Sequence, residues 1–256
     1  MQNPTFRRLL GGQVVVSFGG QVSALAVPTV AILALNAGPM EVGILAALPW
    51  LPSPLLGPIA GALIDRFPRR PVMVAADLGR CLCLLAMGAG LAFGHINLFQ
   101  LYGIALVLGS LGLFFDVAYQ AYLPSAFTDR ELLQVNSRVD MAKSPALVAG
   151  AAVAGLLLST VGPARSVVGA AITFLANAIN LAGVRPAGPP VPETSVHRGL
   201  LREMGDGLVM VARNPILRSI ATATAVSNLG VFMFSSVSLV FAYRSLHLSA
   251  GVIGLV

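Results

Sequence analysis

Charged residues are scarce in this chain of 256 residues, and their scarcity excludes most soluble classes of protein. Lysine, arginine, aspartate and glutamate make up 10% of the sequence, whereas 56% is hydrophobic and the mean hydropathy is +0.84. Soluble domains carry about 25% charged residues. Lipid is therefore the expected solvent for most of the chain, which argues against a cytosolic enzyme, a disordered chain and a nucleic-acid-binding protein.

Cysteine is almost absent as well. Cys81 and Cys83 are the two cysteines, and both lie in one apolar run. They offer neither a disulfide framework nor the spacing of a zinc site. The sequence also lacks a glycine-rich phosphate loop with lysine and a Ser/His/Asp constellation. We therefore predict no enzymatic activity, no metal site and no cofactor.

Long apolar stretches are what the sequence has instead. A membrane-spanning helix needs about 20 predominantly apolar residues. Seven stretches meet this length, at 9–35, 41–63, 72–94, 97–123, 141–161, 164–184 and 216–242. An eighth opens at Val252 and runs to Val256, so we expect the chain to be truncated. The predicted fold class is an all-α integral membrane protein.

Basic residues flank these spans unevenly. With the N-terminus inside, thirteen of the sixteen lie on the cytoplasmic side, Arg165 and Arg244 lie outside, and Arg80 falls within a span. Cytoplasmic loops carry the excess of lysine and arginine in membrane proteins. We therefore expect a multi-pass protein of the cell membrane (plasma or inner) with a cytoplasmic N-terminus, and no nucleic-acid partner.

A cleaved signal peptide is the competing interpretation of the first span. Arg7 and Arg8 precede an apolar stretch, and Ala24–Ala26 resembles a cleavage site. However, Gln13 interrupts the stretch and apolar residues continue to Leu35. A retained span is the preferred interpretation.

Three segments recur at an offset of 211 residues. The recurring pairs are Asn3-Pro4 with Asn214-Pro215, Gly19 with Gly230, and Val42–Leu45 with Ile253–Val256. A shared register of this kind indicates an internal repeat. It predicts a six-helix half at 1–184, a proline-rich cytoplasmic linker at 185–213, and the truncated start of a second half at 214–256. Two equal halves would need roughly 400 residues, with about five helices beyond the last residue.

This architecture resembles the major facilitator superfamily, whose halves each contain inverted three-helix repeats. Residues Gly61–Arg70 are similar to the signature loop of that superfamily, with Pro68 replacing a glycine. Further segments are similar to the branch that contains the enterobactin exporter and the macrolide efflux proteins. These segments are Ala75–Arg80, Leu123–Ser125, Glu131–Asn136 and Leu200–Glu203.

The resemblance implies a secondary active transporter that exports a hydrophobic or amphipathic small molecule by alternating access, with proton coupling left open. Its implied partners are that substrate, protons and the lipid bilayer. Span five keeps Gly150 and Gly155 but lacks the Gly-Pro pair usual in drug antiporters, which argues against drug/proton antiport. Two alternatives remain: a non-transporting fragment, and a membrane receptor or scaffold with the same fold.

The same resemblance implies a conformational latch in the loop between spans two and three. The latch would join the two halves and favour the outward-facing state; the alternative is a purely topogenic basic loop. Its members are Gly61, Asp65, Arg66, Arg69 and Arg70. Gly57 and Gly61 form a small-xxx-small pair, which predicts close approach of spans two and three.

Charges inside spans are costly and default to functional hypotheses. Arg80 in span three and Asp116 in span four both lie about 12–14 Å from the cytoplasmic end, at 1.5 Å per residue. Asp77 is one helical turn from Arg80, so an ion pair with Asp77, Asp116 or both is allowed. Three interpretations follow: a structural ion pair, a proton or cation site at Asp116, or a charge that reaches the membrane surface.

Polar residues share a face in several spans. In the superfamily, spans one, four and seven line the central cavity, so the resemblance makes their polar faces the expected substrate or cation path. The path residues are Gln13, Ser17 and Gln21 in span one, Asp116, Tyr119 and Gln120 in span four, and Thr224 and Asn228 in span seven. The alternative is hydrogen bonding between helices, at about 0.6 kcal/mol per bond. Thr173, Asn177 and Asn180 share another face in span six and are interpreted as residues that hold helices together.

Overall fold

The computed structural model describes residues 4–184, 209–246 and 250–253, and within these ranges every regular element is a helix. This confirms the all-α prediction. The linker predicted at 185–213 lies mostly outside the described residues. Among the described residues, the helices are, in chain order, α1 (Pro4–Leu35), α2 (Pro39–Ala47), η1 (Leu48–Trp50), α3 (Pro52–Arg66), α4 (Arg69–Ala92), α5 (Leu98–Ala126), α6 (Asp129–Thr160), α7 (Pro163–Ala182), α9 (Pro215–Arg244) and α10 (Ala250–Ile253).

Six described segments are long and apolar enough to cross a membrane. They correspond to the first six predicted spans: α1, the segment Pro39–Gly57, α4, α5, α6 and α7. The seventh predicted span forms the single helix α9, whose 30 residues would extend about 45 Å at 1.5 Å per residue. The described part of the chain is therefore a multi-pass membrane bundle.

The second span is broken, where the sequence analysis predicted one continuous helix. It consists of α2, the short 3-10 helix η1 and α3. Pro49 lies in η1 and Pro52 begins α3. Proline has no backbone N–H and clashes with the preceding turn, so it interrupts an α-helix. The break packs against α5 at Gly109, where a Cβ atom would overlap the backbone of Pro49.

The fifth span starts earlier than predicted. Helix α6 begins at Asp129, twelve residues before the predicted start of the span at 141. Its N-terminus is a capping box, in which the Glu131 carboxylate accepts hydrogen bonds from the backbone N–H of Thr128 at 3.0 Å and from its hydroxyl at 2.9 Å. This box satisfies helix-end donors in a polar segment that a search for apolar residues passes over.

The close packing predicted for Gly57 and Gly61 is not observed. No described atom lies within 4 Å of a Cβ built at either glycine. Helix α3 packs mainly against α5 and touches α4 only weakly. The prediction was wrong because the small-xxx-small pattern shows that a helix can approach a neighbour closely, but not which neighbour packs there.

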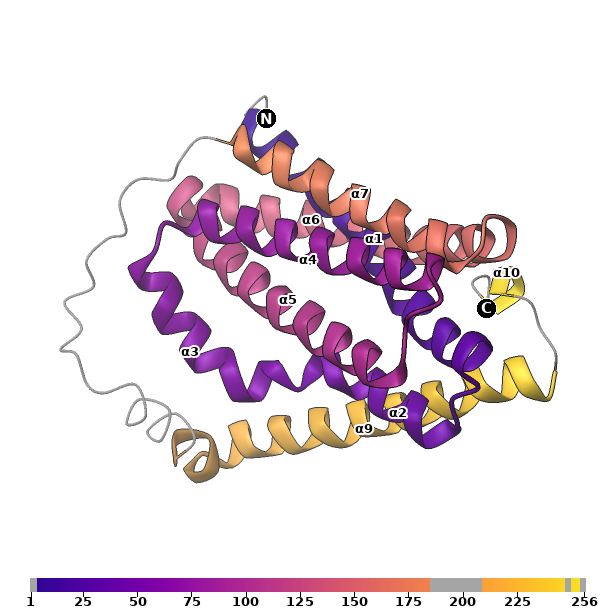
Figure 1. Cartoon of the computed structure of the whole chain (residues 1–256). Coiled ribbons are helices and arrows are strands. Elements are labelled where there is room, and N and C mark those ends of the chain that lie inside the picture. The colour runs from indigo at the N-terminus through magenta and orange to yellow at the C-terminus, as the bar shows by residue number, and fades with distance from the viewer. Residues whose placement is uncertain (1–3, 185–208, 247–249, 254–256) are drawn as a thin grey trace.

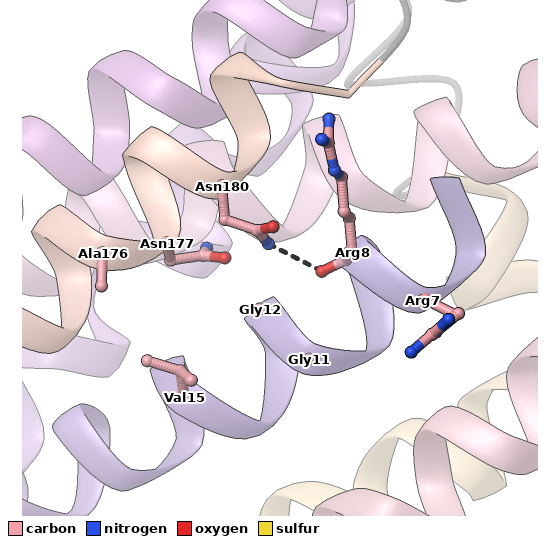
Figure 2. Close-up of a pocket in the computed structure, with 8 residues that line it drawn as sticks. All are labelled: Arg7, Arg8, Gly11, Gly12, Val15, Ala176, Asn177 and Asn180. Carbon is pink, nitrogen blue, oxygen red and sulfur yellow. Dashed lines mark hydrogen bonds between the residues drawn. The ribbon is translucent and has the colours of Figure 1, made fainter. Parts of the chain in front are cut away.

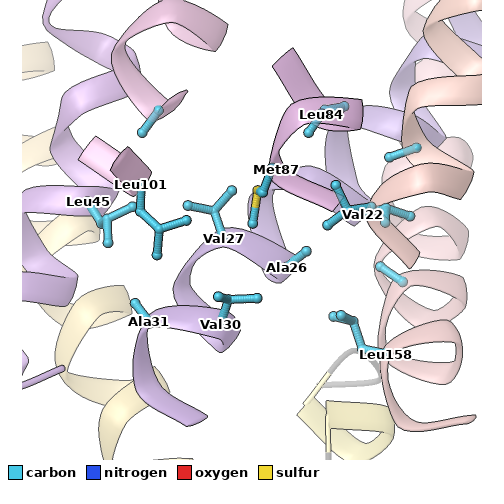
Figure 3. Packing of buried hydrophobic residues seen from close by; sticks show 14 of the residues in the cluster. Val22, Ala26, Val27, Val30, Ala31, Leu45, Leu84, Met87, Leu101 and Leu158 are labelled. Atoms are coloured by element: carbon cyan, nitrogen blue, oxygen red, sulfur yellow. The ribbon is translucent and has the colours of Figure 1, made fainter. Parts of the chain in front are cut away.

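The bundle pairs α4 with α7, α1 with α6 and α7, and α4 with α5 (Figure 1). Two clusters of buried hydrophobic residues fill it, one toward each end of α1. The first, seen in Figure 3, includes Val22, Ala26, Val27 and Val30 of α1 with Leu84, Met87 and Leu101. The second includes Phe6, Leu9, Met73, Phe115 and Tyr122. Because lipid is as apolar as leucine, these clusters contribute mainly close packing.

The start of the predicted second half lies at the edge of the bundle. Helix α9 runs alongside α2, and the short α10 packs against α6 (Figure 1). Both α1 and α9 begin at the proline of an Asn-Pro pair. Asn214 caps α9 by accepting hydrogen bonds from the backbone N–H groups of Ile216 and Leu217.

Candidate functional site

A buried ion pair lies in the interior of the bundle on α4. Arg80 donates from Nη1 to Asp77 Oδ1 at 3.3 Å, one turn away on the same helix. Asp77 is 0% exposed and Arg80 is 7% exposed. The other carboxylate oxygen accepts a hydrogen bond from Asn177 Nδ2 at 2.6 Å. Breaking a buried pair leaves an uncompensated charge, so these three side chains hold one another in place.

Aromatic rings enclose the guanidinium of Arg80. Its Cζ atom lies 5.0 Å from the centroid of the Phe115 ring and 5.3 Å from that of the Phe174 ring. Gly112 leaves room for it, because a Cβ there would come within 3.2 Å of Arg80 Nη2. Cation–π contacts of this kind gain strength when the cation is desolvated. The structure thus holds one positive charge between α4, α5 and α7.

Asp116 occupies a different position from the one that an ion pair with Arg80 requires. Its side chain is exposed, and it makes no ion pair within 4 Å among the described residues. Arg80 and Lys143 both lie close enough to act on it electrostatically. Of the two partners allowed for Arg80 by the sequence, the geometry selects Asp77. Asp116 is left as a carboxylate near two cations and bonded to neither.

Tyr119 lies one turn from Asp116 on α5. Its ring stacks on that of Phe115, with centroids 6.2 Å apart and an interplanar angle of 9°. The residue is 6% exposed, and its hydroxyl has no hydrogen-bond partner among the described residues. Lys143 Nζ lies 6.0 Å from the ring centroid. A carboxylate, an aromatic ring and an ammonium group thus gather where α5 faces α6.

Lys143 and Asp140 were not singled out from the sequence. Both lie on α6, and Asp140 is close enough to act electrostatically on Tyr119. The early start of α6 explains the omission: with a span starting at 141, Lys143 counts as a residue at the membrane surface. With α6 starting at Asp129, Lys143 lies about 21 Å along the helix, at 1.5 Å per residue. The capping box at Thr128 is the signal that could have placed it there.

Two side chains on the polar face of α1 form hydrogen bonds, one within the helix and one to α6. Ser17 donates to the carbonyl of Gln13 at 2.8 Å, and Gln13 is 8% exposed. Gln21 donates from Nε2 to the carbonyl of Leu147 on α6 at 3.5 Å. Gln120 on α5 is exposed. Among the described residues, no hydrogen bond joins this face of α1 to Asp116.

Thr224 and Asn228 lie on α9 and are exposed. The main contact of α9 is α2, so the structure does not bring these two residues together with the polar face of α1. Their part in a shared path remains a prediction.

The residues predicted for the latch have different environments. Arg70 donates from Nε to the carbonyl of Leu181 at 2.9 Å and from Nη2 to the carbonyl of Ala182, and Arg8 donates to the carbonyl of Gly183. These two arginines cap the C-terminal end of α7, where the helix dipole favours cations. Arg66 is exposed, Arg69 has an unpaired Nε among the described atoms, and the side chain of Asp65 lies outside the described set.

Within the described ranges, no group of three or more His, Cys, Asp and Glu side chains is arranged to hold a metal ion. Asn177 and Asn180 do more than fill space between helices. Asn177 binds Asp77, and Asn180 donates from Nδ2 to the backbone carbonyl of Arg8 at 2.7 Å (Figure 2).

The chain is similar to known membrane transporters. A family model described as Major Facilitator Superfamily matches residues 9–256. The multidrug efflux pump Tap of Mycolicibacterium fortuitum is 28% identical over 225 residues, which cover 84% of this chain and 54% of Tap. The uncharacterized MFS-type transporter YfiS of Bacillus subtilis (strain 168) is 28% identical over 165 residues, covering 62% of this chain and 38% of YfiS.

The uncharacterized MFS-type transporter Rv0037c of Mycobacterium tuberculosis is 35% identical over 136 residues, covering 52% of this chain and 31% of that protein. The chain therefore spans about half the length of these relatives, or less.

Proposed function

The chain belongs to the major facilitator superfamily, and from this membership we propose that it contributes the first half of a secondary active transporter. The proposed activity is export of a hydrophobic or amphipathic small molecule, and not catalysis. Similarity to a protein named a multidrug efflux pump supports the export of small molecules. The proposed location is the cell membrane with a cytoplasmic N-terminus, as the uneven distribution of basic residues favours.

The exposed carboxylate of Asp116 is the observation that carries this proposal. Charged side chains in membrane spans almost always face the bundle interior or a water-filled cavity, and they mark ion and substrate pathways. Asp116 is exposed on a spanning helix, has no ion-pair partner in the described part of the chain, and lies near Arg80 and Lys143. A structural ion pair would be buried and closed, as that of Asp77 and Arg80 is.

In the proposed mechanism, Asp116 takes up and releases a proton or another cation as the two halves rock about a midplane site. In this mechanism Arg80 and Lys143, the two cations near Asp116, have different roles. Asp77 and Asn177 hold Arg80 in place, so its positive charge stays beside the path. Lys143 lies on α6, a different helix from Asp116, so movement of α6 against α5 would change the field at the carboxylate.

The latch proposal keeps Gly61, Asp65, Arg66 and Arg69 as the residues that join the halves in the outward-facing state. In this proposal Arg70 does not contact the second half, because its guanidinium is already bound to the end of α7. Arg70 would fix the loop to the first half, leaving its neighbours to engage the second.

Substitution of Asp116 tests the proposal in the protein at its natural length. We expect Asp116→Asn to abolish the pH dependence of efflux of a lipophilic fluorescent dye from everted membrane vesicles, and Asp116→Glu to retain it. Ser110→Ala on the same helix is the control, because the Ser110 hydroxyl donates to the carbonyl of Leu106 within that helix. Unchanged pH dependence of efflux in Asp116→Asn would contradict the role proposed for Asp116, and an absence of dye efflux in the parent protein would support a receptor or scaffold that kept the fold.

A further inference from the structure

A second site lies at the N-terminal end of α1, in a groove between α1 and α7 (Figure 2). Its cavity volume is about 550 Å³, within the range of roughly 300–1,000 Å³ typical of ligand pockets. The groove plays no part in the proposed path of Asp116. The kind of ligand that it binds must therefore be inferred from the residues that line it.

The groove opens away from the polar face of α1. Arg7, Gly11 and Val15 follow one another at intervals of four residues and share one side of the helix. Gly11 and Gln13 are two residues apart, which places them about 200° apart around the helix axis. Val15 is 36% exposed, whereas Gln13 is 8% exposed. The groove therefore lies on the exposed side of α1, roughly opposite to its polar face.

The mouth of the groove is basic. Arg7 and Arg8 line it and leave α1 in different directions (Figure 2). Arg8 is bound to the carbonyl of Gly183 at the end of α7. Arg7 is exposed and has no hydrogen-bond or ion-pair partner among the described residues. The N-terminal end of α1 adds the positive end of a helix dipole, so the free site at the mouth favours an anion.

Beyond the mouth, the groove is lined by apolar residues of α1 and α7 and by two asparagines, Asn177 and Asn180. The apolar lining residues include Gly11, Val15 and Ala176, and Val15 lies about 12 Å further along the helix than Arg7. Asn177 closes one side: it is 2% exposed, its Oδ1 has no partner in the described part of the chain, and its Nδ2 binds Asp77. An occupant of the groove would thus touch a side chain that also holds the buried ion pair.

We propose that this groove binds an anionic phospholipid of the surrounding leaflet, with its phosphate at Arg7 and an acyl chain along Gly11 and Val15. Basic pockets between membrane helices are sites for anionic headgroups. A small soluble anion would pair with Arg7 but leave the apolar lining residues uncovered. A zwitterionic lipid would cover these residues but neutralise Arg7 less well. An anionic lipid matches both the positive charge at the mouth and the apolar residues that line the groove beyond it.

The test is retention of defined lipids by the protein at its natural length. Purified protein is delipidated, titrated with phosphatidylglycerol or phosphatidylcholine, and examined by native mass spectrometry. Arg7→Gln should weaken phosphatidylglycerol binding about fivefold, the effect of one basic residue near an anionic lipid. Gly11→Leu should weaken it at least as much, because a side chain there enters the groove without meeting a described atom within 4 Å.

Two control variants separate the groove from general surface charge. Arg66→Gln removes an equal charge from an exposed residue outside the groove. Gly20→Leu adds an equal side chain on the opposite side of α1, where no described atom lies within 4 Å of a Cβ. Both should bind phosphatidylglycerol like the parent protein.

The proposal is overturned if phosphatidylcholine is retained as well as phosphatidylglycerol, or if Arg66→Gln weakens binding as much as Arg7→Gln. Inorganic phosphate that competes at the same concentration as the lipid would show a small-anion site instead, and would overturn it too. If Gly11→Leu does not fold, the comparison of phosphatidylglycerol binding by Arg7→Gln and Arg66→Gln is enough to test the proposal.

Discussion

A methyl group added at Gly12 should loosen the packing of α1 against α7. A Cβ at this position would overlap the side-chain oxygen of Asn177 and lie 2.9 Å from Asn180 Nδ2. The amide of Asn177 cannot move away freely, because its Nδ2 bonds to Asp77 at 2.6 Å. Gly12→Ala therefore forces a choice between separating the helices and breaking this hydrogen bond.

The expected cost follows from these two contributions. Overpacking a well-packed site costs about 1–3 kcal/mol, and a hydrogen bond between membrane helices contributes about 0.6 kcal/mol on average and up to about 1.7 kcal/mol. Gly12→Ala should thus lower the free energy of unfolding by about 2–4 kcal/mol. Gly11→Ala is the matched control, since no described atom lies within 4 Å of a Cβ there. It should be neutral or stabilising by up to about 1 kcal/mol, the preference of a helix for alanine.

The assay is reversible unfolding in mixed detergent micelles, followed by far-UV circular dichroism. A double-mutant cycle with Asn177→Ala then isolates the contact. Removing the amide makes room for the methyl group, so Gly12→Ala should cost less than about 1 kcal/mol in the Asn177→Ala background. An equal cost in both backgrounds would refute the reasoning, because the collision with Asn177 could not then be its cause.

Three further predictions use the same unfolding assay. Gly109→Ala should destabilise by about 3 kcal/mol, since its Cβ meets the backbone of η1 and not a movable side chain, whereas Gly103→Ala should change little. Arg70→Gln should cost about 1–3 kcal/mol through loss of the two hydrogen bonds to the end of α7, and a similar loss in Arg138→Gln, at an exposed arginine of α6, would contradict a specific cap. Thr128→Ala should cost about 1 kcal/mol and raise amide hydrogen exchange in the first turn of α6, and unchanged exchange would count against the capping box.

The membrane spans could be predicted because hydropathy and length decide them. The two errors in the spans have different causes. The break in the second span could have been predicted from Pro49 and Pro52, because proline lacks the backbone N–H that a helix needs. Counting apolar residues does not detect this missing donor. The polar start of α6 could also have been predicted, from the capping box of Thr128 and Glu131. It was missed because these polar residues precede the apolar stretch by which the span was identified.

The ion pair could be predicted only in its local part. Asp77 and Arg80 are one turn apart, so the helix itself brings them together. Asn177 is 100 residues away, and nothing local to Asp77 indicates that α7 supplies its second partner. The same holds for Arg70. Its acceptors are main-chain carbonyls of α7, and every residue has such a carbonyl, so the sequence cannot identify them. Contacts that depend on which helices become neighbours require the fold.

Different sides of helix α1 have different environments. Gly12 and Gly19 are seven residues apart, about two turns, and both face α7, where a Cβ at Gly19 would overlap the hydroxyl of Thr173. Gln13, Ser17 and Gln21 repeat every four residues on another side, and Arg7, Gly11 and Val15 repeat every four on the side opposite to that. A substitution in α1 should therefore be judged by its angle around the axis more than by its residue type. Gly11 and Gly12 are neighbours in sequence, yet Gly11 has free space around it and Gly12 packs against Asn177, the partner of Asp77. The same change to alanine should therefore be neutral or stabilising at Gly11 and destabilising at Gly12.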